Sequence, residues 1–186
     1  LVPRNMTQAA GMYNALLRIN QPAMVIETLN GYRLKEKMPS NLGDFTTPLG
    51  AVEILRKGSD ITALSYGATL AILQEAAETI AKMGVSVEVI DVQSLLPFDI
   101  EGAVGTSIAK TNRLLIVDED VPGGATAYLL QQLLDKQNIF QSLDSSPQLL
   151  SAKAHRPPYG NDGDYITKPS KEDIIEALYT LMSESD

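Results

Sequence analysis

The sequence of 186 residues contains no cysteine and a single histidine, His155. The missing cysteines exclude disulfide bonds, thiolate metal ligands and cysteine nucleophiles. Their absence also fits a reducing compartment, so we predict a cytoplasmic location. Because there is one histidine, an imidazole general base is restricted to one position in the chain.

Basic residues are outnumbered, because 15 Lys and Arg stand against 23 Asp and Glu, which gives a net charge of −8. Nonspecific nucleic-acid binding draws on clustered Lys and Arg, so we expect no nucleic-acid partner. No run reaches the roughly 18 apolar residues of a membrane span, and the first residues show no signal-peptide pattern, so we expect no membrane association. The hydrophobic content of 44% is sufficient for a packed core.

Strand-like and helix-like patterns alternate along most of the chain. Apolar runs predict strands over residues 52–57, 61–66, 85–92, 114–117 and 148–152. Helical spacing predicts helices over residues 68–83, 125–136 and 171–182, and Asp99 is expected to cap a further helix that runs to about residue 109. Alternating strands and helices form a mostly parallel sheet that is covered on both faces. The sequence therefore predicts an α/β fold, a three-layer α/β/α sandwich around a five-stranded sheet.

The first part of the chain is organised differently. Helical spacing predicts a helix over residues 6–18, and an apolar run predicts a short buried strand over residues 23–27. Residues 29–50 have no periodicity and carry several Gly and Pro, which predicts a long linker. We therefore assign residues 1–45 to the remnant of a preceding domain and residues 46–186 to the α/β domain, and we expect the chain to be part of something longer.

Ligands of open α/β sheets bind beyond the carboxyl ends of the strands. The residues expected there are Tyr66-Gly67, Gln93-Ser94, Glu119-Asp120 and His155-Arg156. The acidic run at residues 118–120 is either an acid–base or metal cluster or part of a subunit interface. Adjacent strand residues point to opposite faces, so at most two of the three carboxylates converge, and the pattern favours the interface.

The lone histidine lies in a proline-stiffened loop that also holds Arg156 and Tyr159. A general base needs a partner, and the spacing identifies none, so His155 is a weak catalytic candidate and the loop is predicted to serve an interface. Pro-Gly-Gly at residues 122–124 follows a strand and opens a helix, where N–H groups bind phosphate in other proteins. It lacks a Gly-x-Gly-x-x-Gly fingerprint and follows three carboxylates, which favours a tight structural turn.

Six short motifs occur in an order that resembles one enzyme family. They are Asn-Gln-Pro-Ala-Met-Val-Ile-Glu at residues 20–27, Asn-Gly-Tyr-Arg at 30–33, Gly-Ser-Asp-Ile-Thr at 58–62, Glu-Val-Ile-Asp at 88–91, Leu-Pro-Phe-Asp at 96–99 and Val-Asp-Glu at 117–119. Together they resemble the C-terminal domain of the transketolase superfamily, in the form carried by beta subunits of thiamine-diphosphate-dependent 2-oxo acid dehydrogenases. Residues 1–45 resemble the end of the pyrimidine-binding domain that precedes it.

The resemblance implies an oxidoreductase that oxidatively decarboxylates a 2-oxo acid and passes the acyl group to a lipoyl arm. It implies thiamine diphosphate and magnesium in the full-length enzyme, with no cofactor and no activity expected on this chain alone. The implied partners are other dehydrogenase subunits or domains, a lipoyl acyltransferase core and further copies in a homo-oligomer. The candidate contact residues are Glu119, Asp120, His155, Arg156 and Tyr159.

Two segments depart from the family pattern. Residues 155–164 stand where the beta subunits usually have a Val-Pro-x-Pro-Tyr-Ala loop, and the linker at residues 33–41 leaves open a form with fused alpha and beta parts. Pyruvate and branched-chain 2-oxo acids both stay open as substrates. Two other functions also stay open: a stand-alone α/β interaction or ligand-binding module, and the C-terminal domain of transketolase or deoxyxylulose phosphate synthase.

Overall fold

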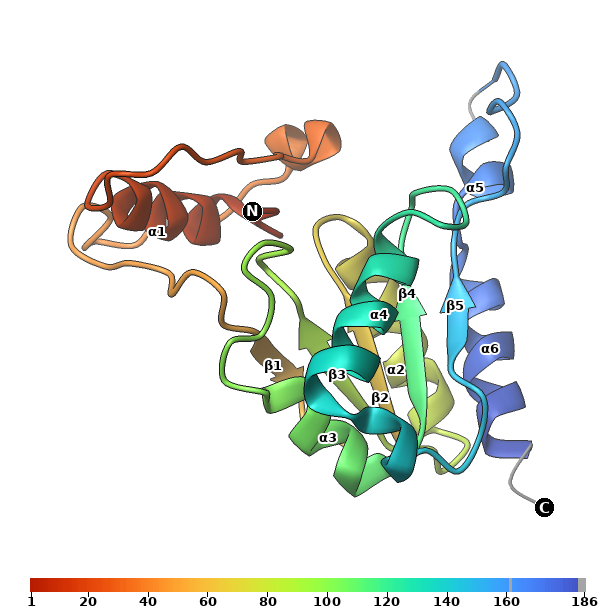
Figure 1. Ribbon diagram of the computed structural model, residues 1–186. Helices are drawn as coiled ribbons and strands as arrows, with labels where there is room; N and C mark the ends of the chain where they lie inside the picture. Colours follow the sequence, from red (N-terminus) through yellow and green to blue (C-terminus); the bar gives the residue numbers. More distant parts are fainter. Residues whose placement is uncertain (161, 184–186) are drawn as a thin grey trace.

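A five-stranded sheet forms the centre of the computed structural model, which describes residues 1–160 and 162–183 (Figure 1). The strands are β1 (Glu53–Arg56), β2 (Ile61–Ser65), β3 (Val87–Asp91), β4 (Leu114–Val117) and β5 (Gln148–Leu150). Their order across the sheet is β1-β3-β2-β4-β5. Only the edge strand β1 is antiparallel to its neighbour, and the other three pairings are parallel. The predicted mostly parallel sheet is confirmed.

Helices cover both faces of this sheet. One face carries α2 (Thr69–Ala81) and α6 (Lys171–Ser183), and the other carries α3 (Ala103–Thr111) and α4 (Ala125–Gln137). The three inner strands are buried along their whole lengths, as expected for strands with a helical layer on each side. The predicted three-layer α/β/α sandwich is confirmed. The short helix α5 (Gly163–Thr167) and the 3₁₀ segment η2 (Ile139–Ser142) lie in the connections.

The start of α3 differs from the prediction. The helix begins at Ala103 rather than directly after the predicted cap, Asp99. Backbone φ angles of 40° at Asp99 and 68° at Gly102 interrupt a right-handed helix before that point. Asp99 nevertheless caps the helix, because its carboxylate accepts hydrogen bonds from the N–H groups of Ala103 (3.0 Å) and Val104 (2.8 Å).

The N-terminal part of the chain consists of α1 (Met6–Leu16) and the 3₁₀ segment η1 (Leu29–Arg33), joined by irregular segments. The helix predicted over residues 6–18 is confirmed, but the strand predicted over residues 23–27 is wrong. That segment is held by two backbone hydrogen bonds, from Leu1 N to Met24 O (2.8 Å) and from Ile26 N to Leu1 O (2.9 Å). Met24 is 74% exposed and Ile26 54% exposed, so the apolar run does not mark a buried strand.

This N-terminal part lies at the carboxyl ends of the strands (Figure 1). The N–H of Val2 donates to the carbonyl of Gln93 (2.9 Å), and the N–H of Thr47 donates to the carbonyl of Gly11 (3.0 Å). The first residues of the chain therefore contact the loop that follows β3. The division of the chain at residues 45 and 46 stays a prediction.

Candidate functional site

The acidic run after β4 is split among three environments. Asp118 is 2% exposed, and its Oδ2 atom accepts no hydrogen bond from the described residues. Burial raises the pKa of the Asp118 carboxyl, although a hydrogen bond with Tyr66 acts in the opposite direction. Tyr66 follows the neighbouring strand, and burial, followed by its contact with Asp118, raises the pKa of its phenol. Asp118 is therefore a buried partner of Tyr66 and faces no solvent.

The other two carboxylates have partners of their own. Glu119 forms an ion pair with Lys168, in which Nζ and Oε2 are 2.8 Å apart. The carboxylate of Asp120 accepts a hydrogen bond from the N–H of Val121 (2.8 Å), and its carbonyl accepts one from the N–H of Ala152 (2.8 Å). No two of the three carboxylates form a shared acid–base pair among the described contacts. In the described part of the chain, no three His, Asp or Glu side chains are grouped as a metal site would require.

The Pro-Gly-Gly segment forms a tight turn, as predicted. The N–H of Gly124 donates to the carbonyl of Val121 (3.1 Å), and Gly123 has a φ of 90°. The Asp120 carboxylate fills the space beside Gly124, because its Oδ2 lies 2.2 Å from where a Cβ atom of that residue would stand. A carboxylate in this position repels an anion, so the turn is not a phosphate site.

His155, Arg156 and Tyr159 lie together in the exposed loop between β5 and α5. The His155 ring nitrogen Nδ1 lies 3.0 Å from the Arg156 carbonyl oxygen, and the Arg156 guanidinium lies 4.9 Å from the centre of the Tyr159 ring. Tyr159 is 86% exposed, so its ring is covered by little other than this cation. The arrangement is a cation–π pair on the surface, and it gives His155 no acid or hydroxyl partner.

Backbone and side-chain contacts join this loop to the acidic run. The hydrogen bond from Ala152 N to Asp120 O ties the segment after β5 to the segment after β4. Lys168, at the end of α5, reaches Glu119, and the N–H of Lys153 donates to the carbonyl of Thr167 (2.9 Å). The five predicted contact residues therefore lie on two connected loops at the carboxyl edge of the sheet.

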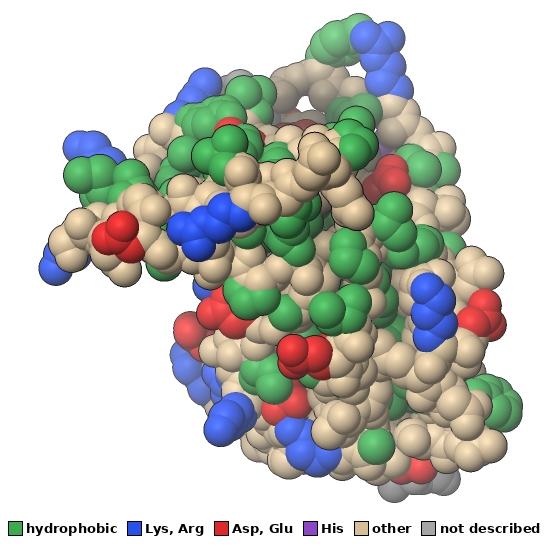
Figure 2. Space-filling model, turned by 60° about the vertical axis from the view of Figure 1, so that its left-hand side comes forward, with side chains coloured by type: hydrophobic (Ala, Val, Ile, Leu, Met, Phe, Trp, Pro, Cys, Tyr) green, Lys and Arg blue, Asp and Glu red, His purple; other side chains and the backbone are tan. Residues whose placement is uncertain are grey.

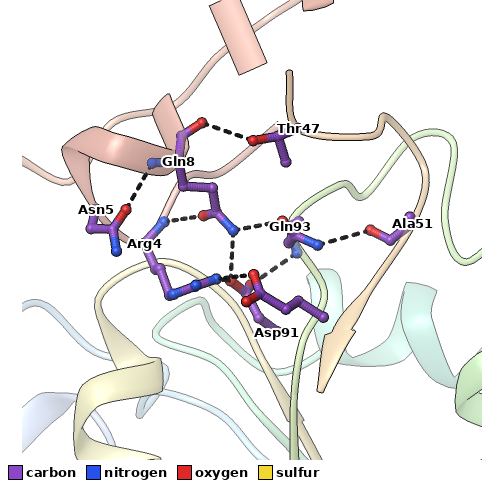
Figure 3. A network of polar contacts seen from close by, with 8 residues as sticks. Arg4, Asn5, Gln8, Thr47, Ala51, Asp91 and Gln93 are labelled. Carbon is purple, nitrogen blue, oxygen red and sulfur yellow. Dashed lines mark hydrogen bonds and ion pairs between the residues drawn. The ribbon is translucent and has the colours of Figure 1, made fainter. Parts of the chain in front are cut away.

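The sequence predicts Gln93 at this edge but does not reveal the second polar group to which it belongs. We call it the Arg4–Asp91 network, and it consists of Arg4, Gln8, Glu53, Asp91 and Gln93. Figure 3 labels all of these residues except Glu53. Nη1 of Arg4 lies 2.6 Å from Oδ2 of Asp91 and 2.7 Å from Oε2 of Glu53. Nε2 of Gln8 donates to the same Asp91 oxygen (3.1 Å) and to Oε1 of Gln93 (2.6 Å). Burial raises the pKa of the Asp91 carboxyl, and the Arg4 and Gln8 contacts act against this.

The N-terminal part also presents an apolar surface. Five of its side chains are at least two-thirds exposed: Leu17, Met24, Leu29, Leu34 and Met38. A groove of about 300 Å³ runs between this segment and the loop after β3, and its lining includes Leu16, Ile19, Met24, Leu96 and Pro97. Figure 2 shows hydrophobic side chains gathered on this side of the molecule. None of the described helices combines the length with the apolar character that a membrane crossing needs.

The sheet order and the two helical layers define a three-layer α/β/α domain with its polar residues at the carboxyl edge. The family described as "Transketolase, C-terminal domain" matches residues 50–174. The chain therefore belongs to the transketolase C-terminal domain family, and the resemblance found in the sequence is confirmed. A solved structure, "Split gene transketolase, inactive beta4 tetramer", superposes on all of this chain with a TM-score of 0.74, and the match spans 58% of the solved chain. The two sequences are 17% identical, so this likeness shows the fold alone.

The curated relatives are dehydrogenase and oxidoreductase subunits. The pyruvate dehydrogenase E1 component subunit beta of Mesostigma viride is 34% identical over 94% of this chain and 52% of its own length. The same subunit of Chlorokybus atmophyticus is 36% identical, over 91% of this chain and 50% of its own length. The acetoin:2,6-dichlorophenolindophenol oxidoreductase subunit beta of Bacillus subtilis (strain 168) is 32% identical, over 99% of this chain and 53% of its own length. The chain spans about half the length of the curated relatives it matches.

Proposed function

We propose that this chain is the C-terminal half of the beta subunit of a thiamine-diphosphate-dependent dehydrogenase that oxidises a 2-oxo acid or a related substrate. One observation carries the proposal. The family domain covers residues 50–174, whereas the beta-subunit relatives match 91% or more of the chain and so include residues before position 50. A stand-alone module that shares only the α/β fold gives no reason for this similarity to extend into the N-terminal segment. We accordingly assign residues 1–45 to the end of the pyrimidine-binding domain.

The cofactor is proposed to bind outside this chain. The glycine turn after β4 faces the Asp120 carboxylate, which disfavours a diphosphate, and no metal-ligand group of three side chains occurs in the described ranges. Both observations support a cofactor site outside this chain. We assign no catalytic step to the described residues, and His155 is not included in the proposed chemistry.

The proposed role of the chain is subunit assembly and the docking of partners, including the lipoyl acyltransferase. The contact surface is the pair of connected loops that holds Glu119, Arg156 and Tyr159. Asp120 is a poor probe of this surface, because its carboxylate also holds the turn beside Gly124. Glu119→Lys is the better probe, because it replaces an exposed ion-pair partner of Lys168 and leaves the turn intact. Weaker assembly of this variant supports the surface, and unchanged assembly contradicts it.

Two relatives of similar identity support pyruvate and acetoin as substrates to test on the complete enzyme, and branched-chain 2-oxo acids stay open beside them. The beta subunits of pyruvate dehydrogenase and of an acetoin oxidoreductase match this chain at 34% and 32%. Comparing pyruvate-dependent and acetoin-dependent reduction of 2,6-dichlorophenolindophenol by the assembled enzyme separates them. We also propose a cytoplasmic location, although some relatives are chloroplastic proteins in Arabidopsis thaliana and Oryza sativa.

Calorimetric titration with thiamine diphosphate and magnesium tests the proposed function. The titration is done on this chain and on a longer beta subunit assembled with its alpha partner, with thiamine lacking the diphosphate as the control. Binding to the assembly but not to this chain supports the proposal. Binding to this chain alone overturns the placement of the cofactor. Absence of binding to either favours the stand-alone interaction module.

A further inference from the structure

The contacts that attach the N-terminal segment to the sheet are mainly polar. Gln8, Asp91 and Gln93 are each less than 7% exposed, and all three belong to the Arg4–Asp91 network. The N–H of Arg4 donates to Oε1 of Gln8 (2.7 Å), which fixes both side chains of the segment relative to each other. Every polar side chain of the network thus has a partner, as a buried polar cluster requires.

The loop after β3 is shaped to receive this segment. Gln93 has a φ of 58°, a left-handed conformation that non-glycine residues seldom adopt. Its N–H donates to Oδ1 of Asp91 (3.0 Å), its side chain donates to the carbonyl of Ala51 (3.3 Å), and its carbonyl accepts from Val2 (2.9 Å). The unusual backbone therefore turns three groups of one residue toward three different segments.

Apolar contacts of the segment with the sheet edge are few by comparison. Its buried apolar side chains are Val2, Pro3, Ala9 and Met12. Further along, Leu17 is 85% exposed, and several large apolar side chains that follow it are also exposed. A charged pair at the edge of a small apolar contact is costly to break, because removing one partner leaves the other buried without compensation.

We propose that the Arg4–Asp91 network holds residues 1–16 on the carboxyl edge of the sheet, so that this segment opens as a unit when the network is broken while the α/β/α domain stays folded. The segment thereby presents the exposed apolar side chains at residues 17–38 in a fixed position relative to the domain. This inference concerns the chain itself and does not depend on the proposed enzymatic role.

Hydrogen exchange of the 186-residue chain tests the inference, with peptides from α1 and from α2 compared in the same experiment. Arg4→Met should speed exchange in α1 at least about tenfold while exchange in α2 changes little. Glu53→Gln is the matched control, because it removes the exposed partner of Arg4 and leaves Asp91 paired. This control should leave the exchange rates of both helices within about twofold of those in the unmodified chain.

A second variant separates release of the segment from general unfolding. In Arg4→Met combined with Asp91→Asn, no buried charge remains unpaired, so α2 should exchange as in the unmodified chain while α1 still exchanges faster. Equal acceleration of α1 and α2 in both variants would overturn the inference, because the network would then support the whole domain. Unchanged exchange of α1 in the variants would also overturn the inference. So would a finding that α1 of the unmodified chain already exchanges at the rate of an unstructured peptide.

Discussion

Arg4 and Asp91 are 87 positions apart in the sequence, and Nη1 of the arginine lies 2.6 Å from Oδ2 of the aspartate. Asp91 is the last residue of β3 and is fully buried, whereas Arg4 precedes the first helix. The pair therefore connects the start of the chain to the carboxyl edge of the central sheet. It is an ion pair with one buried partner, and its removal has consequences that an exposed pair does not have.

Replacement of Arg4 by methionine should lower the free energy of opening the N-terminal segment by about 3 kcal/mol, because Asp91 would remain buried with its charge unpaired while the segment is closed. Glu53→Gln should cost less than about 0.5 kcal/mol, because that carboxylate is half exposed and water replaces the arginine. Hydrogen exchange of the α1 amides, converted to free energies of opening, measures both values. Similar losses in the two variants would contradict the unequal roles given to the two carboxylates.

The stability of the chain should depend on the ionisation of Glu88. Burial raises the pKa of this carboxyl, but hydrogen bonds from Lys110, Ser107 and the N–H of Gly58 outweigh burial and hold the pKa below its ordinary value of 4.5. A carboxyl whose pKa is lower in the folded state stabilises that state above the unfolded pKa. Its contribution is lost as the pH falls through the folded pKa.

Glu88→Gln should therefore be less stable than the unmodified chain at pH 7, and the difference should shrink as the pH falls below about 4.5. Chemical denaturation at pH 7, 5 and 3 provides the test. The matched control is Asp60→Asn. The Asp60 carboxylate lies at the same end of the sheet and accepts a hydrogen bond from the N–H of Ser86. If the stability difference between Glu88→Gln and the unmodified chain instead grows as the pH falls, the pKa of Glu88 is not lowered in the folded state.

The regular part of the fold could be predicted because each element has its own pattern. The apolar runs at residues 61–66 and 114–117 became fully buried strands, and the amphipathic spacing at residues 68–83 became α2. These signals are local, since burial on both faces requires continuous apolar residues. The run at residues 23–27 has the same local pattern, yet Met24 is exposed. Local pattern alone does not show whether a partner strand is present.

The candidate site was predictable only in part. The carboxyl ends of the strands follow from the α/β alternation, which located Glu119 and Asp120 at the correct edge. The Arg4–Asp91 network was missed because its members are ordinary polar residues far apart in the sequence. The left-handed conformation of Gln93 has no sequence signal either, since glutamine is not a residue type that favours it. Contacts of this kind depend on tertiary structure.

A glycine in the loop between β1 and β2 should resist substitution. A Cβ atom on Gly58 would lie 2.2 Å from the backbone nitrogen of Glu88 and 2.2 Å from the backbone carbon of Val87. Because backbone atoms cannot move aside as a flexible side chain does, Gly58→Ala should cost about 2 kcal/mol or more. Gly43→Ala is the control, since nothing lies within 4 Å of its added Cβ. Equal melting temperatures of the two variants would contradict this close approach.

The exposed aromatic ring of the loop between β5 and α5 provides a test of partner docking. Tyr159 is 86% exposed and is stacked on Arg156, so Tyr159→Ala should leave the melting temperature unchanged within about 1 °C. If this loop contacts the acyltransferase, the same change should weaken binding at least about tenfold, because aromatic side chains that become buried at the centre of an interface often carry much of its binding energy. Tyr179→Ala on α6, where the ring is 58% exposed, is the matched control. Surface plasmon resonance with the acyltransferase core measures the affinity of both variants. An equal loss of affinity in the two variants would place the docking surface elsewhere, and so would unchanged affinity of Tyr159→Ala.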